Sequence, residues 1–247
     1  MIDAVLFDLD GTLVDHRGAA ARAVKQMVSR FHAPGRSESE LLGAWWASED
    51  VHMAEYLDGE CSFDEQRRRR LRDIFPLLGL PTTLDDVELD AWFTTNYLAD
   101  YEAGWRSFPD AWDCIRRLTG STPSVMTGVM TNGDPDQQRS KLIRVGLLPW
   151  IGPVLTPTEL AFAKPHPSSF LEACHRLELS PNRTVFVGDS LSVDARGATS
   201  AGLVGVWLDR GDDDDSGETT AQLSDGLPVY RISSLTELPD LVGSLSV

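Results

Sequence analysis

Two aspartates follow an apolar segment at the start of the chain. The sequence opens MIDAVLFDLDGTLVDH, so Asp8 and Asp10 stand directly ahead of Gly11 and Thr12. Alternate residues of an extended chain point to the same side, and two carboxylates so placed repel each other unless a cation or a shared proton compensates them. Asp-Gly is also a common turn dipeptide, and for the pair alone a simple turn is an equally good interpretation. Partners elsewhere in the chain must decide between a turn and a site.

Two later segments carry groups suited to such a site. Thr131 and Asn132 end the apolar run SVMTGVMTN at a point where a helix is expected to begin, and free N–H groups at a helix start bind anions. Lys164 lies in AKPHP, where prolines stiffen the backbone ahead of another expected helix. A lysine there would neutralise a carboxylate cluster or a phosphate oxygen. Taken alone, the first segment favours an ordinary strand-turn-helix junction, and the second is a weak signal because surface Lys-Pro pairs are common.

A third segment supplies two more acids. Asp189 follows the apolar run TVFVG, and Asp194 lies five residues later in the first turns of an expected helix, where it would also complement the helix dipole. Asp189 holds the same kind of position as Asp8, at the carboxyl end of an expected parallel strand, and open α/β sheets bind ligands at that edge. Four strand ends thus bring acids, a Thr-Asn pair and a lysine to one edge. Independent turns would not be expected to give this set, so the pattern predicts a site.

The elements that position these residues alternate between short apolar runs and helical patterns. Strands are expected at 5–9, 124–132, 184–189 and 202–209, with shorter ones at 153–157 and 228–232. Helices are expected near 109–119, 135–145, 167–178, 191–201 and 234–243. This alternation predicts an α/β fold with a Rossmann-like parallel sheet core, flanked by helices and joined by right-handed crossovers.

One long segment breaks the alternation. Residues 16–104 show helical spacing of apolar residues and no convincing strand. We therefore expect an α/β core formed by 1–15 and 105–247, with 16–104 as an inserted all-helical domain. Ser37 and Ser62 are expected helix N-caps, and Ser62 with Glu65 fits a capping box.

The helical insertion also carries arginines and aromatic residues. The run Arg67–Arg70, followed by Arg72, invites a phosphate-binding interpretation, but a helix face paired with Asp64, Glu65 and Asp73 is favoured. Rings that would serve a substrate pocket are more often core at helical spacing. These candidates are Trp45, Trp46, His52, Tyr56, Trp92, Tyr97 and Trp105.

Composition limits the classes of partner. The chain has 247 residues, a formal net charge of −16 and a sequence pI of about 4.6, which argues against a nucleic-acid surface. No apolar run approaches membrane-spanning length, and the first strand leaves no room for a signal peptide, so no membrane partner and a cytoplasmic location are expected. Three scattered cysteines fit reduced thiols. The acidic segment 210–220 is expected to be a solvated loop.

The four site segments together resemble the motifs of the haloacid dehalogenase (HAD)-like hydrolase superfamily of aspartate-nucleophile enzymes. FDLDGT resembles its first motif, MTN its second, AKPHP its third and GDSLSVD its fourth, in matching order and spacing. The helical insertion is similar to the type 1 cap of subfamily I. The stretches HMAEYLDGECSFDEQRRRRLR and WRSFPDAWDCIRRL resemble a subgroup with 5′-nucleotidase-like and acylneuraminate-phosphatase-like members.

This resemblance, with the chemistry of the residues, implies a phosphatase that needs Mg²⁺. Asp8 would attack phosphorus and form an aspartyl-phosphate, while Asp10 would protonate the leaving oxygen and later activate water. By the same resemblance, Thr131 and the Asn132 backbone would hold the phosphate, and Lys164 would neutralise charge. Mg²⁺ would be bound by Asp8, Asp189 and the Asp10 carbonyl. Asp194 would orient Lys164 or the metal waters, and Gly11 and Thr12 would form the turn.

Asp10 also separates alternative chemistries. Dehalogenases of the superfamily generally lack an acid at this position because halide needs no proton, so dehalogenation is not expected here. A phosphomutase retains both acids and remains an alternative, as does a catalytically silent binding protein on the same fold. The expected partner is a small phosphorylated metabolite, and the sequence identifies neither which one nor the oligomeric state.

Overall fold

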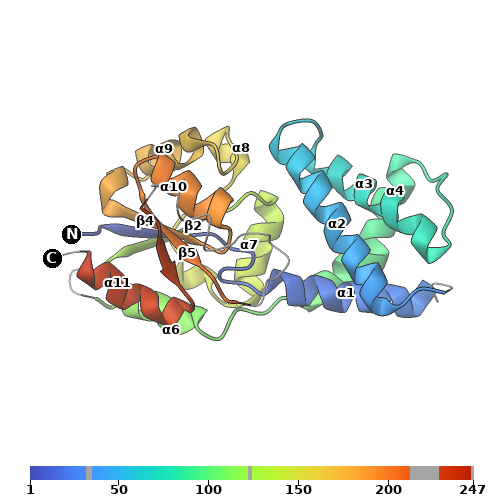
Figure 1. Ribbon diagram of the computed structural model, residues 1–247, viewed down its shortest axis with the longest axis horizontal. Coiled ribbons are helices and arrows are strands. Elements are labelled where there is room, and N and C mark those ends of the chain that lie inside the picture. Colours follow the sequence, from blue (N-terminus) through green and yellow to red (C-terminus); the bar gives the residue numbers. More distant parts are fainter. Residues whose placement is uncertain (32–34, 122–123, 212–227, 246–247) are drawn as a thin grey trace. The chain divides into compact units, whose positions relative to one another are not determined.

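The chain folds into two compact units. The computed structural model describes residues 1–31, 35–121, 124–211 and 228–245 (Figure 1). Met1–Asp15 and Arg106–Val247 form one unit, called the core unit here, and His16–Trp105 form the other, called the helical unit. Trp105, which the sequence analysis assigned to the core, packs edge-on against Tyr101 of the helical unit with 5.6 Å between ring centroids.

A parallel six-stranded sheet forms the centre of the core unit, in the order β3-β2-β1-β4-β5-β6. Its strands are β1 Ala4–Phe7, β2 Met126–Met130, β3 Val154–Leu155, β4 Thr184–Gly188, β5 Val204–Leu208 and β6 Tyr230–Ile232. The predicted α/β class is therefore confirmed. β1 lies between β2 and β4, with Leu6 opposite Gly128 and Phe186. Asp8 and Asp189 come directly after β1 and β4, at the same edge of neighbouring strands.

Helices cover both faces of this sheet (Figure 1). α6 (Ala111–Thr119) and α11 (Leu238–Ser244) lie on one face, and α9 (Pro167–Arg176) and α10 (Gly197–Ser200) lie on the other. α6 buries positions three and four apart, which are Ala111, Cys114, Ile115 and Leu118. They join a hydrophobic cluster with Val5 and Phe7, which face that side of β1. Leu6 points to the other side and packs with Phe170 of α9.

The remaining helical segments of the core unit lie close to the strand ends. α7 spans Pro135–Arg144, and α8, a single turn that the sequence analysis did not predict, spans Pro157–Leu160. The predicted helix at 191–201 divides into a π-helical turn, Leu191–Arg196, followed by α10. Short 3₁₀ turns lie at Leu148–Trp150, Pro181–Arg183 and Leu235–Glu237.

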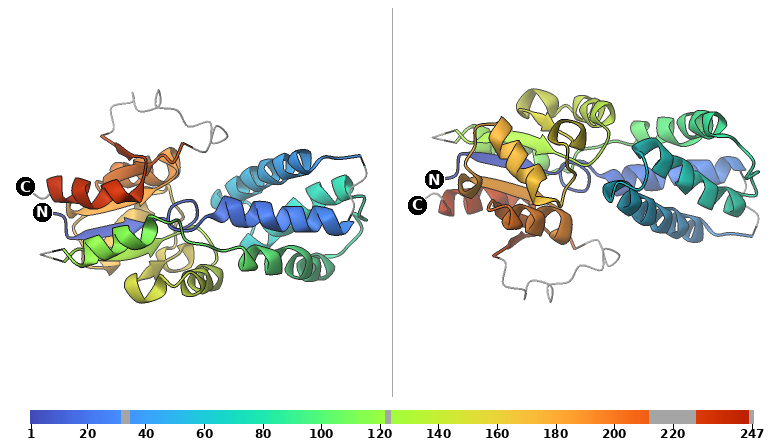
Figure 2. Two further views of the ribbon diagram at one scale, coloured as in Figure 1. Left: turned by 90° about the horizontal axis from the view of Figure 1, so that it is seen from below. Right: turned by 90° about the horizontal axis from the view of Figure 1, so that it is seen from above.

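The helical unit is built from α1 (His16–Phe31), α2 (Glu38–Leu57), α3 (Phe63–Ile74), α4 (Asp86–Phe93) and α5 (Ala99–Ala103). A 3₁₀ turn, Phe75–Leu78, follows α3, and a π-helical turn, Thr94–Leu98, joins α4 to α5. α1 packs against α2 and α5, and α3 packs against α2 and α4 (Figure 2). Three of the aromatic candidates, Trp45, Tyr97 and Trp105, are buried in this bundle, whereas the other four are half-buried.

Both predicted N-caps are present, but the capping box lies elsewhere. The Ser37 hydroxyl accepts from the Glu40 backbone N–H, and the Glu40 carboxylate accepts from the Ser37 N–H, which completes a box. The Ser62 hydroxyl accepts from the Glu65 N–H alone. The Glu65 carboxylate instead pairs with Arg69 and Arg72, so it does not return to the cap.

Other sequence expectations have mixed outcomes. All three cysteines are free thiols, with Cys114 and Cys174 buried. None of the helices in the described ranges is both long and apolar enough to span a bilayer. The expected acidic loop at 210–220 lies almost entirely outside the described residues.

Candidate active site

A buried lysine links two of the predicted acids. The Lys164 ammonium donates to Asp8 Oδ1 and to Asp194 Oδ1, each at 2.7 Å, and all three side chains are almost fully buried. Burying a cation costs several kcal/mol unless charges of opposite sign surround it, so this lysine depends on its two carboxylates. Asp194 also accepts from the Ser190 backbone N–H through Oδ2 at 3.1 Å. Its position on the π-helical turn after β4 directs it toward Lys164.

Asp189 completes a group of three carboxylates. One oxygen from each of Asp8, Asp189 and Asp194 lies within 4.8 Å of the others. Thr12 holds Asp189 through two bonds, since its hydroxyl donates to Asp189 Oδ1 at 3.3 Å and accepts from the Asp189 N–H at 3.1 Å. A third bond runs from the Trp207 indole N–H to the Asp189 carbonyl at 3.0 Å. The first and fourth predicted motifs therefore meet at one point.

These carboxylates fit a divalent cation. Asp8 Oδ2 is buried and has no hydrogen-bond partner among the described residues, although a charged oxygen in that position normally has one. Mg²⁺ binds oxygen ligands and usually takes one or two protein carboxylates. Asp8 and Asp189 were the predicted side-chain ligands, and the structure adds Asp194 to the cluster. The carboxylate of Asp10 lies apart from it, in a different ion pair.

Like charge and burial shift the proton affinities of these groups. Burial, with a smaller contribution from Asp194, raises the pKa of Asp8 to about 6 even though Lys164 lowers it. Burial and the charges of Asp8 and Asp194 raise the pKa of Asp189 well above its usual range. Burial acts to lower the pKa of Lys164, but Asp194 and Asp8 outweigh it and raise that pKa. A cation bound among the acids would relieve this repulsion.

The second motif holds the third in place. The Asn132 side chain donates to the Lys164 carbonyl and accepts from the Lys164 N–H, both at 2.8 Å. This pair of bonds fixes the backbone from which the buried ammonium extends. The side chain of Asn132 is therefore used to position Lys164, which leaves its backbone for the predicted contact with phosphate.

Asp10 is held by two residues that the sequence analysis did not identify. Lys141 Nζ donates to Asp10 Oδ1 at 2.5 Å and to Oδ2 at 2.8 Å, and Gln138 Nε2 donates to Oδ2 at 2.7 Å. Both residues are buried on α7. Their signal lay in the helix period, because Gln138, Lys141 and the apolar Leu142 are spaced to share one inward face. A lysine on an apolar face indicates a buried partner.

Two glycines make room for the carboxylates. A Cβ atom on Gly11 would lie 2.1 Å from Asp189 Oδ2, and Gly11 has φ +87°, in the region that favours glycine. A Cβ atom on Gly188 would lie 2.2 Å from Asp194 Oδ2. The predicted role of Gly11 in the turn therefore has a second part, which is to leave space for an acid of the site.

Because the carboxylate cluster is expected to bind Mg²⁺ for catalysis, replacing Gly11 with Ala should weaken Mg²⁺ binding and lower turnover by a factor of about ten or more. The added methyl group must displace Asp189, and the left-handed backbone at this position costs a further 1 kcal/mol or so. Isothermal titration with Mg²⁺ and steady-state kinetics check this. Gly43→Ala, on a helix where nothing lies within 4 Å of the new Cβ, is the matched control. Wild-type Mg²⁺ affinity in Gly11→Ala would contradict the prediction.

The arginine run of the helical unit is paired internally. Each of its arginines lies within ion-pair distance of a carboxylate; these pairs include Arg67 with Asp64, Arg68 with Asp90, Arg69 with Glu55, Arg70 with Glu49 and Arg72 with Asp86. Asp73, a predicted partner, is instead bound by His52 and Ser48. Arg70 is buried rather than solvated, and its guanidinium lies over the Trp45 ring at 4.5 Å. The run is therefore structural within the bundle.

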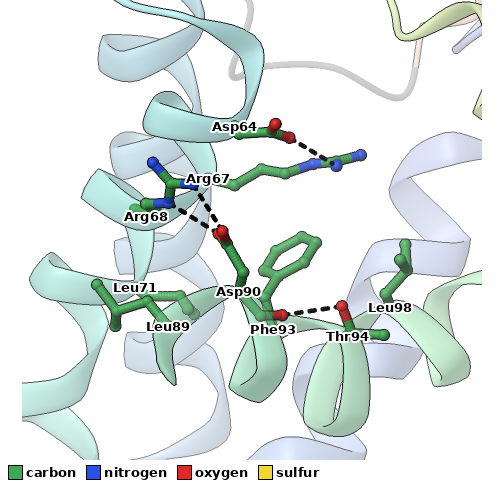
Figure 3. A pocket seen from close by; sticks show the side chains of 9 residues that line it. All are labelled: Asp64, Arg67, Arg68, Leu71, Leu89, Asp90, Phe93, Thr94 and Leu98. Atoms are coloured by element: carbon green, nitrogen blue, oxygen red, sulfur yellow. Dashed lines mark hydrogen bonds and ion pairs between the residues drawn. The ribbon is translucent and has the colours of Figure 1, made fainter. Parts of the chain in front are cut away.

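A small pocket beside this run has the same character. It encloses about 190 Å³ between α3 and α4 (Figure 3). Figure 3 shows Arg68 paired with Asp90 and Arg67 directed to Asp64, so both arginines that line the pocket already face carboxylates. Because these arginines are already paired with aspartates, the pocket does not favour a phosphate.

Comparison with known proteins identifies the arrangement. A profile for haloacid dehalogenase-like hydrolases matches residues 2–202, which include every predicted site residue. The chain belongs to this family. The superfamily resemblance noted from the motifs is thus confirmed. In this HAD-like hydrolase, Asp8 and Asp189 at the strand ends of the sheet lie within the matched residues.

Relatives extend over the full HAD-like hydrolase chain. It is 30% identical to the glyceraldehyde 3-phosphate phosphatase of Methanopyrus kandleri over 250 residues, covering 100% of this chain and 99% of that one. It is 27% identical to the human N-acylneuraminate-9-phosphatase, covering 99% and 95% of the two chains. A HAD hydrolase from Bacillus subtilis, solved bound to magnesium, has the same fold, with a TM-score of 0.80 at 23% identity over 98% of this chain and 99% of that one.

Proposed function

We propose that this HAD-like hydrolase removes phosphate from a small phosphomonoester metabolite, with Mg²⁺ as cofactor and a phosphorylated Asp8 as intermediate. The observation that carries the proposal is the environment of Asp8. One of its oxygens is held by Lys164 at 2.7 Å, the other is buried without a hydrogen-bond partner among the described residues, and a second acid follows two residues later. The fixed orientation suits a nucleophilic carboxylate, and the unpartnered oxygen suits a cation beside it.

Asp8 would perform the first bond exchange. One carboxylate oxygen of Asp8 attacks phosphorus as the bond from phosphorus to the ester oxygen breaks, which divides one difficult displacement into two easier ones. Lys164 lies where it offsets the negative charge of the phosphoryl oxygens, which otherwise repel an anionic nucleophile. Mg²⁺, held by Asp8, Asp189 and the backbone carbonyl of Asp10, would supply further positive charge to the transferring group.

Thr131 is suited to hold a phosphoryl oxygen. Its hydroxyl oxygen accepts from Gln138 Nε2 at 2.8 Å and from the Gly133 N–H at 3.3 Å. Because both bonds are accepted, the hydroxyl hydrogen is left to donate to an anion. The Asn132 N–H would donate beside it, while Asp194 keeps Lys164 oriented.

Asp10 would move the protons. It gives a proton to the leaving oxygen in the first step, and in the second step it takes one from the water that attacks phosphorus and frees Asp8. A halide leaving group needs no such proton, so the second acid favours phosphate esters over haloacids.

The relatives support a small substrate. The phosphatases matched over their full length are named for glyceraldehyde 3-phosphate and N-acylneuraminate 9-phosphate, which are both small phosphorylated molecules. We propose that the helical unit acts as the cap that selects such a molecule. The three free thiols fit a protein of the reducing cytoplasm, where such metabolites occur.

Release of inorganic phosphate from a panel of small phosphomonoesters, with Mg²⁺ and with EDTA, tests the proposed function. We expect turnover that depends on Mg²⁺ and differs widely among sugar, acyl-sugar and nucleoside phosphates. An isomerised sugar phosphate without phosphate release would indicate a mutase. Binding of phosphorylated ligands with no turnover of any of them would indicate a silent binding protein.

Mg²⁺ is expected to stabilise the folded protein more at about pH 7 than at about pH 5. A ligand present at a hundred times its Kd stabilises by about 2.7 kcal/mol. Because the pKa of Asp8 is raised to about 6 without metal, its ionised form destabilises the metal-free fold as the pH rises through 6, and below that pH a proton competes with Mg²⁺. Thermal unfolding with and without Mg²⁺ at both pH values measures this. An equal Mg²⁺ effect at both would contradict it.

A further inference from the structure

The acid at position 10 has its own supporting pair, and both members come from one helix. Gln138 and Lys141 are three residues apart on α7, so their side chains project from the same face. Together they make three hydrogen bonds to the two oxygens of the Asp10 carboxylate, at 2.5 to 2.8 Å. Donors on both oxygens fix the carboxyl plane, which leaves little freedom for the side chain to rotate.

Lys141 is placed at an energetic cost. Its relative exposure is 0%, whereas the Asp10 side chain is 27% exposed. Burial of an ammonium group is unfavourable by several kcal/mol unless it is paired, and an apolar residue of similar length would fill the same space without that cost. The ion pair with the partly exposed acid therefore indicates a function beyond packing.

Gln138 connects this acid to the predicted phosphate contact. The same Nε2 atom donates to Asp10 Oδ2 at 2.7 Å and to Thr131 Oγ1 at 2.8 Å. A Cβ atom on Gly133 would lie 2.1 Å from Gln138 Nε2, so the glycine directly after the second motif leaves the space that this amide occupies. The Gln138 side chain thus fixes the position of Asp10 relative to Thr131, which would hold a phosphoryl oxygen.

We propose that Lys141 and Gln138 are positioning residues for proton transfer by Asp10, an inference that rests on the proposed function. As the bond between phosphorus and the ester oxygen breaks and Asp8 bonds to phosphorus, the Asp10 proton passes to the departing oxygen. The negative charge left on Asp10 then faces the Lys141 ammonium. Because that charge develops during the step, a fixed cation there favours the transition state over the ground state.

The proposal predicts an effect that depends on the leaving group. An alkoxide is a poor leaving group and needs the proton, whereas p-nitrophenolate departs without one. Benzyl phosphate, phenyl phosphate and p-nitrophenyl phosphate are similar in shape and differ strongly in the basicity of the group released. The value of kcat/KM reports the first irreversible step, in which the ester bond breaks, and so isolates this transfer from the later hydrolysis of the phosphorylated enzyme.

Lys141→Met is expected to lower kcat/KM about 100-fold for benzyl phosphate and less than about fivefold for p-nitrophenyl phosphate, within the range usual for general acid catalysis. Lys141→Arg, which keeps the cation, should retain most of the wild-type ratio between the two substrates. Gln138→Leu removes the other donor and should shift the ratio in the same direction, and it provides the test should Lys141→Met fail to fold by circular dichroism.

Arg144→Met is the matched control, since it removes an exposed cation from the same helix. Equal losses on all three substrates in Lys141→Met and Gln138→Leu, or no loss on any, would overturn the proposal while the phosphatase function stood. A wild-type enzyme that hydrolyses none of the three and no member of the metabolite panel would instead overturn the proposed function, and this inference with it.

Discussion

Replacing Asp8 with Asn is expected to lower kcat for phosphate release by a factor on the order of 10⁶, because removing an enzyme's nucleophile costs about that much. The substitution keeps the size of the side chain and its acceptor oxygen for Lys164, which donates to Asp8 Oδ1 at 2.7 Å. It removes the charge and the second oxygen, which is buried without a hydrogen-bond partner among the described residues. The loss would therefore be chemical. Folding should be retained or improved, since it also relieves repulsion from Asp189 and Asp194.

Stopped assays of phosphate release with purified wild type and Asp8→Asn measure this loss. Asp136→Asn, an exposed acid on α7, removes the same charge from the surface of the core unit and should leave kcat unchanged. Turnover of Asp8→Asn within tenfold of wild type, in protein free of contaminating phosphatase, would show that another residue attacks phosphorus.

Replacing Lys164 with Met should reduce both turnover and stability. The buried ammonium is the centre of two ion pairs, with Asp8 and Asp194, and taking it away leaves buried carboxylates facing each other. Breaking a buried pair in this way typically costs about 3–5 kcal/mol. Losing the charge that steadies the transferring phosphoryl group should lower kcat by about 10³. No other single substitution among the described residues is expected to act so strongly on both.

The stability loss of Lys164→Met should depend on pH. Burial raises the pKa of Asp8 to about 6, and without Lys164 that pKa would rise further. Protonation of Asp8 then removes the repulsion between the buried carboxylates as the pH falls. Denaturant unfolding without metal should therefore show a larger difference from wild type at about pH 8 than at about pH 5. Lys25→Met, an exposed lysine of the helical unit, is the control. A pH-independent difference would argue against the carboxylate cluster as its cause.

The sequence predicted the strand ends well because their signals are local. A buried run such as AVLF followed by Asp8, or TVFVG followed by Asp189, marks both a strand and the edge where it stops. Parallel topology then places these ends together whatever the loops do. The structure accordingly brings Asp8, Lys164, Asp189 and Asp194 into contact range.

The partners of Asp10 were missed because the helix spacing that places Gln138 and Lys141 on one face does not show which acid they bind. Lys141 lies 131 residues from Asp10 in the chain, and a lysine within PDQQRSKLIR looks like an ordinary surface residue. Only the tertiary packing of α7 turns it inward. The π-helical turn at Leu191–Arg196 was missed for a similar reason. The sequence predicts a helix there but does not show that Asp194 lies in a π-helical turn.

Ser62 shows how charge pairs along the same helix override a capping motif. The spacing of Ser62 and Glu65 predicts a reciprocal capping box, and half of it forms. Arg69 and Arg72 compete for the Glu65 carboxylate and bind it at 3.4 and 3.0 Å. A bidentate or charge-assisted partner is stronger than a neutral backbone N–H, so the arginines prevail.

Trapping of the phosphorylated enzyme tests the central claim most directly. Asp10→Asn, which slows the second step, is mixed with p-nitrophenyl phosphate and Mg²⁺, quenched in acid, digested and analysed by tandem mass spectrometry. We predict a phosphoryl group on Asp8 that is lost on treatment with hydroxylamine and is absent from Asp8→Asn, Asp10→Asn protein. Release of p-nitrophenol with no phosphoryl group on the protein, or with one on a different residue, would contradict the mechanism.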